Sequence, residues 1–214
     1  TSLGAASPTY FYLGKLVSQE WTNNLDLTKE VQLGAFTKPL FVAAGLEYRK
    51  NRYEIGLGDQ ASYIIGTATV PVGQSTGVGT PAAGGAQGVS GFGPLSAGVF
   101  SRSNWSAYIN LEQSIGDKID LSVAGRHEDY SDFGTADTAK ISGRFAPIEE
   151  FAVRATASTG FRAPSLPQQH YASSSTIGVL LPGATSTVLY PVQLLPPDSP
   201  AAMALGAKPL EPEK

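Results

Sequence analysis

Apolar and polar side chains alternate with a period of two along most of the chain, which is typical of half-buried β-strands. In the clearest stretch, residues 105–112, the odd-numbered positions are apolar and the even-numbered positions are polar. Helical spacing fits only a short segment at 199–205. The pattern predicts one or two strands over 10–36, and single strands over 39–55, 103–115, 118–130, 136–146 and 151–160.

The predicted strands are long, and the links between them differ in length. Several reach the ~9–11 residues that a tilted strand needs to cross a bilayer, whereas an average globular strand has ~5–6. The links at 37–38, 116–117 and 147–150 are short, but the segments 56–102 and 161–214 are long and irregular. Short turns on one side and long loops on the other are typical of an outer-membrane barrel. We therefore expect an all-β, antiparallel transmembrane β-barrel segment whose two long segments are extracellular loops.

Composition narrows the class of protein further. The 214 residues include 15 Lys and Arg, 18 Asp and Glu, 2 His and no Cys, which gives a net charge of −3. Without a basic excess there is no electrostatic case for nucleic-acid binding, and without Cys there is no thiolate metal site. No apolar run is long enough for a transmembrane helix. The segment 56–102 carries only Asp59 and Arg102 as charges, and we expect it to be mobile unless a ligand or a neighbouring loop holds it.

Several stretches of the chain carry a family resemblance through their order and spacing. They are AGLEYR at 44–49, GRHEDYSDFG at 125–134, KISGRF at 140–145, ASTGFRAPSL at 157–166 and LGAKPLEPEK at 205–214. In this order they resemble the barrel of TonB-dependent outer-membrane receptors, from about residue 21 to residue 214. In the last stretch Glu211 stands where the family usually has Lys.

The resemblance implies a barrel of about 22 strands with a plug domain inside it. It also implies a short box through which the inner-membrane energy-transducing TonB complex acts. Since the chain contains neither plug nor box, we expect residues 1–214 to be an internal piece of about six or seven strands. The implied function is energy-dependent uptake of a scarce nutrient (a ferric siderophore, corrinoid or oligosaccharide) across the outer membrane of a Gram-negative bacterium. The implied partners are the TonB complex, outer-membrane lipid and the small-molecule nutrient.

Candidate ligand-binding residues lie on the predicted lumen face or at the rim of the barrel. Charged side chains on one face could steer a ligand, although pairing with one another or with a plug explains them more simply. The rim residues flank Pro164, which should end the strand ladder, so a structural corner is the simpler explanation there. These candidates are Arg126, Glu128, Arg144 and Arg154 on the face, and Phe161 and Arg162 at the rim.

The sequence predicts no catalytic site, no metal site and no cofactor. His127 and Glu128 are neighbours in a strand and therefore face opposite sides, so they cannot chelate one ion without a bulge. Residues 129–134 indicate a strand end followed by a turn, with calcium binding there as a minor alternative. The glycine-rich stretch 84–93 lacks the Gly-Lys-Ser/Thr ending of a phosphate-binding loop. We therefore expect that the protein is not an enzyme.

Two other classes of protein remain open at this point. One is a passive outer-membrane pore, which would conduct without binding a ligand tightly. The other is a soluble β-sandwich binding module, in which the face of Trp105, Ile109 and Leu111 would pack against a second sheet. The ligand itself is not disclosed, although the low charge of the long loops favours a substrate that is not highly anionic.

Overall fold

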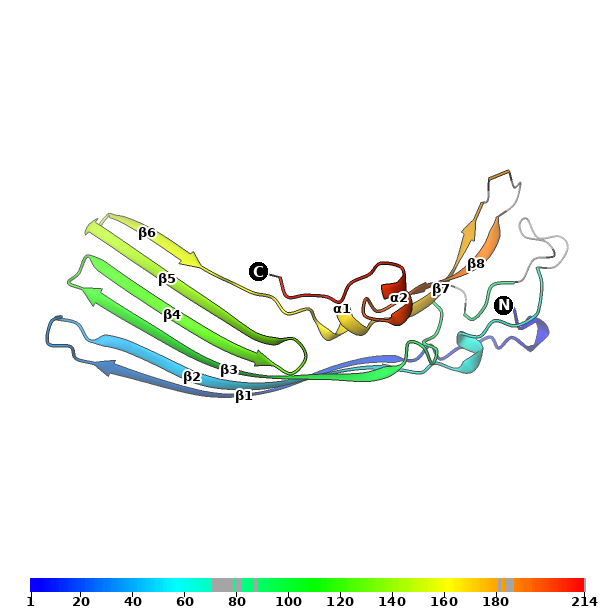
Figure 1. The fold of residues 1–214 in the computed structure, drawn as a ribbon, viewed down its shortest axis with the longest axis horizontal. Coiled ribbons are helices and arrows are strands. Elements are labelled where there is room, and N and C mark those ends of the chain that lie inside the picture. Colours follow the sequence, from blue (N-terminus) through cyan, green and yellow to red (C-terminus); the bar gives the residue numbers. More distant parts are fainter. Residues whose placement is uncertain (71–78, 80–81, 87, 181, 184–186, 214) are drawn as a thin grey trace. The chain divides into compact units, whose positions relative to one another are not determined.

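A six-stranded sheet with strands in the order β1 to β6 dominates the fold (Figure 1). The computed structural model describes residues 1–70, 79, 82–86, 88–180, 182–183 and 187–213. Each strand follows its neighbour in sequence, and the pairs from β3 to β6 are antiparallel. This arrangement confirms the all-β, antiparallel part of the predicted fold class. The strands are β1 (Lys15–Val31), β2 (Leu40–Gly56), β3 (Gly98–Ile115), β4 (Ile119–Tyr130), β5 (Gly134–Ile148) and β6 (Phe151–Ser158).

The registers of β3 to β6 explain why the sheet has two chemically different faces. Even-numbered residues pair with even-numbered residues on the next strand, as in Ser106 with Glu128 and Asp120 with Arg144. The exception is Ile148, which pairs with Phe151 beyond a register shift after Phe145. Because successive side chains of a strand point to opposite sides, the other even-numbered side chains of these strands share one face. We call this side the polar face and the odd-numbered side the apolar face. The sequence alternation predicted this division.

The apolar face stays uncovered. Trp105 is 60% exposed and Ile109 is 48% exposed, and large side chains on the neighbouring strands behave in the same way, as Leu121, Val123, Ile141, Phe145, Phe151 and Val153 do. A soluble β-sandwich requires this face to pack against a second sheet. For the described residues that alternative prediction is therefore wrong. A contiguous exposed apolar surface indicates contact with a partner or with lipid.

Aromatic rings gather at one level of the apolar face. Tyr48 on β2 contacts Trp21 on β1 edge-on, with ring centroids 5.9 Å apart, and contacts Trp105 on β3 at 4.6 Å. Further along β2, beyond Tyr48, the same side carries the charged residues Lys50, Arg52 and Glu54. Rings of this kind are favoured where a strand leaves the hydrocarbon layer for the polar interface.

Two turns show why the sheet folds back where it does. Gly116, between β3 and β4, has φ +61°, and Gly134, after the turn at residues 131–133, has φ +87°. Side chains with a Cβ rarely adopt this left-handed backbone, so glycine fits both positions. The turn predicted within 129–134 is confirmed.

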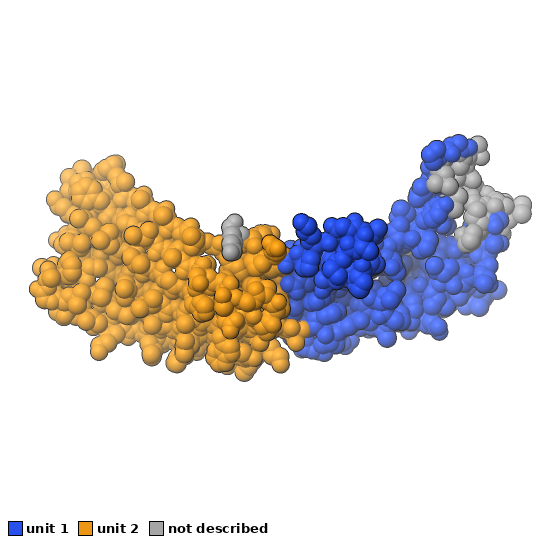
Figure 2. All heavy atoms as spheres, in the orientation of Figure 1, with its two compact units in different colours: residues 1–19, 52–100, 165–210 blue, residues 20–51, 101–164, 211–214 orange. Residues whose placement is uncertain are grey.

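The chain divides into two compact units, which are coloured separately in Figure 2. Unit 1 comprises residues 1–19, 52–100 and 165–210, and unit 2 comprises residues 20–51, 101–164 and 211–214. The buried centre of unit 1 is apolar: Tyr53, Ile55 and Leu166 pack with Phe92, Phe100 and Tyr171. The long strands β1, β2 and β3 contribute residues to both units.

The low-charge segment 56–102 is tied to neighbouring chain where it is described. The amide of Phe92 donates to the carbonyl of Leu13 at 2.9 Å, and the amide of Gly58 donates to the carbonyl of Phe92 at 2.9 Å. Ser62 is fully buried and donates to the carbonyl of Asp59 at 2.6 Å. Residues 71–78, 80–81 and 87 of this segment lie outside the described residues. For them the expectation of mobility stays a prediction. The strand β3 begins at Gly98, five residues before the predicted start at 103.

The prediction that 161–214 is an irregular loop apart from a short helix at 199–205 is wrong. This region contains the hairpin β7 (Ser173–Val179) and β8 (Val188–Leu194) and the short helices α1 (Leu166–His170) and α2 (Pro200–Ala204). Pro191 interrupts the strand pattern of β8, but a two-stranded sheet tolerates it because each strand has a free edge. The helix predicted at 199–205 is confirmed, with Ser199 accepting a hydrogen bond from the amide of Ala202.

The remaining helical elements are two single 3₁₀ turns, η1 (Gly4–Ala6) and η2 (Gln60–Ser62). Among the described residues, no helix has the length and apolar content needed to cross a membrane.

Candidate functional site

The candidate site is the polar face of unit 2, where four of the six predicted residues lie. Arg126 and Glu128 follow each other on the polar side of β4, and Arg144 on β5 lies directly opposite Arg154 on β6. The prediction that these four side chains share one face is confirmed. They form two groups, because Arg126 and Glu128 lie toward the turn after Tyr130, whereas Arg144 and Arg154 lie toward the opposite ends of the strands.

Arg126 and Glu128 satisfy one another and their neighbours. The Arg126 guanidinium donates to Glu128 at 2.5 Å, to Glu47 on β2 at 3.0 Å and to the Ser106 hydroxyl on β3 at 2.7 Å. The other carboxylate oxygen of Glu128 accepts from the Tyr130 hydroxyl at 2.5 Å. Side chains with this many partners stiffen the wall, since each charge-assisted hydrogen bond would be lost if the group turned to a ligand.

The network continues to β1 across a gap left by a glycine. The Tyr108 hydroxyl on β3 donates to Asp26 on β1 at 2.6 Å, and it does so over Gly45 of β2. A Cβ at position 45 would lie 2.6 Å from the Asp26 carboxylate and would therefore displace this bond. The absence of a side chain at Gly45 lets polar groups on non-adjacent strands meet.

A buried arginine that was not among the predicted candidates connects several segments at the end of the polar face near the turn at residues 131–133. Arg102 on β3 is only 6% exposed, and its Nε donates to Asp132 at 2.8 Å. Its Nη2 donates to the carbonyl of Pro164 at 2.8 Å. The guanidinium carbon also lies 5.2 Å from the centroid of the Phe133 ring and 5.8 Å from that of Tyr130. Arg102 thus joins β3, the β4–β5 turn and the segment after β6.

Sequence reasoning missed Arg102 because it assigned residues up to 102 to a loop. With β3 starting at Gly98, Arg102 continues the even-numbered polar series of Asn104 and Ser106. Both of these are also buried, and Asn104 is 2% exposed, with no partner for its Nδ2 among the residues that the structure describes. The alternation extended two positions upstream would have placed Arg102 on the polar face.

The two predicted rim residues have different surroundings. The Phe161 ring lies 5.6 Å from that of Tyr130 and 6.0 Å from that of Phe133, so it belongs to the aromatic group around Arg102. Arg162 is a backbone bridge partner of Glu213, with hydrogen bonds of 3.0 and 3.1 Å, and its side chain is 70% exposed. Contact of either residue with a ligand stays a prediction.

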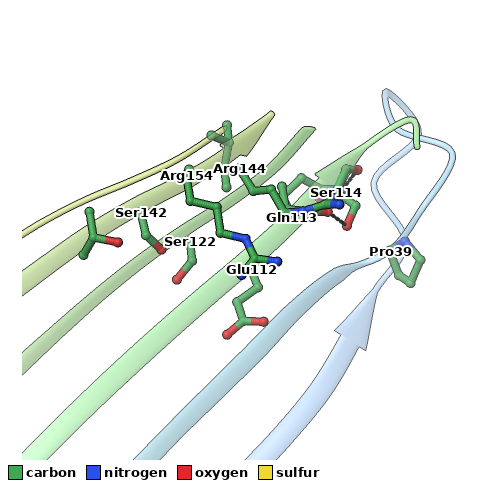
Figure 3. Close-up of a pocket in the computed structure, with 12 residues that line it drawn as sticks. Pro39, Glu112, Gln113, Ser114, Ser122, Ser142, Arg144 and Arg154 are labelled. Carbon is green, nitrogen blue, oxygen red and sulfur yellow. Dashed lines mark hydrogen bonds and ion pairs between the residues drawn. The ribbon is translucent and has the colours of Figure 1, made fainter. Parts of the chain in front are cut away.

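A cavity of about 300 Å³ lies on the polar face (Figure 3). It is at the end of the sheet that carries the turns at 116–118 and 149–150, which we call the short-turn end. The Arg144 Nη1 donates to Asp120 at 3.1 Å, but no described residue accepts a hydrogen bond from its buried Nε. Arg154 has no hydrogen-bond or ion-pair partner among the described residues. The lining is otherwise mostly polar, and includes Glu112, Ser114, Ser122, Ser142 and Thr156. A smaller hollow of about 190 Å³ lies beside Arg126 and Lys140.

The histidine suggested as a metal or acid–base group lies on the other side of the sheet. His127 is on the apolar face, where its Nδ1 lies 2.6 Å from Asp137 on β5, whereas Glu128 is on the polar face. The predicted opposite orientation of His127 and Glu128 is confirmed. Within the described ranges, no three His, Cys, Asp or Glu residues come together in a way that could hold a metal ion.

Comparison with known proteins gives the chain a family. Residues 2–214 match the family model described as TonB dependent receptor-like, beta-barrel. A search of solved structures found the siderophore receptor PirA from Acinetobacter baumannii, with a TM-score of 0.45 and 17% sequence identity. This match covers 82% of the present chain but only 22% of the receptor chain. A search of curated proteins found no match.

Proposed function

Because the chain belongs to the TonB-dependent receptor β-barrel family, we propose that it forms part of the wall of an outer-membrane receptor for energy-dependent nutrient uptake. The family consists of receptors and transporters, and the assignment is to transport, not catalysis. The cell would be a Gram-negative bacterium, since only such cells have an outer membrane of this kind.

The single observation that carries the proposal is the two-faced sheet. Its apolar side leaves Trp105, Ile109 and Ile141 about half exposed or more, while its polar side holds ion pairs such as Arg126 with Glu128. A barrel wall between lipid and a polar lumen needs this division. The strands are also long enough, since β3 has 18 residues and β4 has 12, against the ~9–11 that cross a bilayer.

The position of the aromatic residues supports the same orientation. Tyr48 contacts both Trp21 and Trp105 on the apolar face, and charged residues follow Tyr48 along β2. This order fits a strand that leaves the hydrocarbon at the level of the rings. The long segments 56–102 and 161–214 would then lie outside the cell and bind the ligand, together with polar-face side chains. The short turns at 116–118 and 149–150 would face the periplasm.

The proposed ligand is a scarce, large nutrient: a ferric siderophore, a corrinoid or an oligosaccharide. Binding alone cannot drive net import against a gradient, because a ligand shifts an equilibrium only by its difference in affinity between states. The proposal therefore includes the inner-membrane TonB complex as the energy-transducing partner, acting through a plug domain. Arg126 and Glu128 would mainly stiffen the wall, and Phe161, Arg162, Arg144 and Arg154 would be the ligand-facing candidates.

The test is uptake in cells with and without the energy-transducing partner. Cells that carry the receptor should import radiolabelled ferric siderophore, corrinoid or oligosaccharide only when the TonB complex is present. Import that is unchanged after removal of the complex would overturn the proposal and favour a passive pore. Conductance of the purified protein in planar bilayers provides the matching measurement, since a passive pore should conduct steadily without any ligand.

A further inference from the structure

We propose that Arg144 and Arg154 form a binding site for an oxyanionic group, a carboxylate or a phosphate, at the short-turn end of the polar face. The inference rests on the proposed function, because the group would belong to a small molecule moving along the wall of the receptor. It adds a ligand chemistry that the low charge of the long loops does not indicate.

The first argument is an uncompensated pair of like charges. Arg144 and Arg154 are direct partners in the β5–β6 register and lie on the same face. Like charges directly opposite each other on neighbouring strands are destabilising. Asp120 neutralises only Arg144, at 3.1 Å, and no described residue neutralises Arg154. An anion bound between the two guanidinium groups would turn this repulsion into two attractions.

The second argument is the number of free donors at this point. The Nε of Arg144 is buried without a partner, and the whole Arg154 guanidinium is unpaired among the described residues. Arginine presents its N–H groups in a fork that matches the paired oxygens of a carboxylate or phosphate. A lysine at this position would not indicate such paired oxygens, because its ammonium group is a point charge without a fork of N–H groups.

The third argument is the surroundings of the arginine pair. The next row of the register on the polar face places Ser122 opposite Ser142 and Ser142 opposite Thr156. At the far end of this row Glu112 lies opposite Ser122 and brings one carboxylate to the lining of the cavity. Figure 3 shows the Arg154 side chain extending toward Ser122 and Glu112 and the Arg144 side chain extending toward Ser114. Hydroxyls can donate to further oxygens of the same ligand. The cavity of about 300 Å³ is large enough for a small polycarboxylate.

The other arginines of the polar face lack this availability. Arg126 has three acceptors within 3.0 Å, and Arg102 is held by Asp132 and Pro164. The Nη2 of Arg49 is held by Glu47 at 2.9 Å, although its Nε, like that of Arg144, has no hydrogen-bond partner among the described residues. A ligand at any of these positions would first have to displace an internal bond. At Arg154 none of the described residues provides such a bond.

The test measures binding of citrate and inorganic phosphate to the intact protein in detergent micelles. Citrate is followed by saturation-transfer difference NMR, and phosphate is added as its competitor. Arg154→Gln should raise the dissociation constant for citrate at least about five-fold, since charge-assisted hydrogen bonds to an anion are lost. The dissociation constant of the variant R154K should lie between those of the wild type and R154Q, because lysine keeps the charge but lacks the forked N–H groups of arginine.

Lys140→Gln is the matched control. It removes one positive charge from the same face of β5, about 13 Å from Arg144 along the strand. Its dissociation constant should stay within about two-fold of the wild-type value, because that distance exceeds the ~8–10 Å Debye length of physiological salt. A wild-type protein that binds neither anion, or a K140Q loss as large as that of R154Q, would overturn the inference.

The experiment separates this inference from the proposed function. Direct binding requires neither energised cells nor the TonB complex. Partner-dependent uptake with no anion binding at Arg154 would overturn the inference alone. Anion binding in a protein whose uptake ignores the partner would overturn the proposed function and leave the site. Thermal melts of R154Q and R154K by circular dichroism verify that both variants fold.

Discussion

Arg102 and Arg154 lie on the same face of one sheet, but near opposite ends of it and in opposite circumstances. Arg102 is 6% exposed and makes hydrogen bonds to Asp132 and to the carbonyl of Pro164. Arg154 lies on the edge strand β6, is exposed, and has no partner among the described residues. The comparison teaches that face and residue type do not decide the role of a charge. Burial and pairing decide it, because a buried charge must be satisfied within the protein.

The largest expected effect follows removal of the buried charge. Arg102→Ala leaves Asp132 and the Pro164 carbonyl without their donor and should lower the free energy of unfolding by about 3 kcal/mol. The measurement is urea-dependent unfolding in phospholipid vesicles. Arg154→Ala is the matched control, with a change of no more than about 0.5 kcal/mol. Equal losses in the two variants would contradict the comparison.

A conservative change at the same buried position should have the next largest effect. Arg102→Lys keeps the charge, but one ammonium group cannot reproduce bonds to both Asp132 and Pro164 together with the stacking on Phe133. We expect a loss of about 2 kcal/mol in the same unfolding assay. Amide hydrogen exchange at Arg162 should also become faster, since this segment is held beside Pro164. Stability equal to that of the wild type would show that charge alone is sufficient.

A smaller effect should follow loss of one bond from a network that keeps its other members. Tyr130→Phe removes the hydroxyl that donates to Glu128, while Arg126 still pairs with that carboxylate. The expected loss is about 1 kcal/mol. Tyr190→Phe is the control, because no described residue bonds the Tyr190 hydroxyl. If both variants lose the same amount, the hydrogen bond to Glu128 adds nothing to stability.

The smallest effect on stability should come from the exposed pair. Arg154→Gln removes a charge that lies opposite Arg144 and has no counter-ion in the described part of the chain. The free energy of unfolding should therefore stay the same or rise by up to about 0.5 kcal/mol. The unfolding assay is repeated with added citrate, which should stabilise the wild type more than the variant. A clear destabilisation without ligand would show that Arg154 has a structural partner after all.

The pattern of alternation predicted the strands and faces well, because register and burial both follow from a period of two. It placed Arg126, Glu128, Arg144 and Arg154 on one face of the sheet, and it placed His127 on the other face from Glu128. It could not reveal which charges pair, because Arg126 meets Glu47 from a strand 79 positions away in the sequence. The role of Arg102 depends equally on Asp132 and Pro164, which come from different parts of the chain.

The region after β6 was harder to predict for a local reason. Its hairpin consists of short strands, and β8 contains Pro191, which ordinarily argues against a strand. The capped helix α2 was predictable because Ser199 and Pro200 form a signal that needs no distant partner. Local signals were therefore reliable, whereas contacts between distant segments were not available from the sequence.

The bridge between Arg162 and Glu213 has a consequence for how such a wall can diversify. Two backbone hydrogen bonds bring together the points where the chain departs after β6 and where it returns, with about 50 residues between them. Doubling the length of such an excursion adds only about 0.6 kcal/mol of closure entropy. The sheet can therefore keep its strands unchanged while this insert is lengthened, shortened or exchanged. The insert is thus a segment in which ligand specificity can change without a change in the strands.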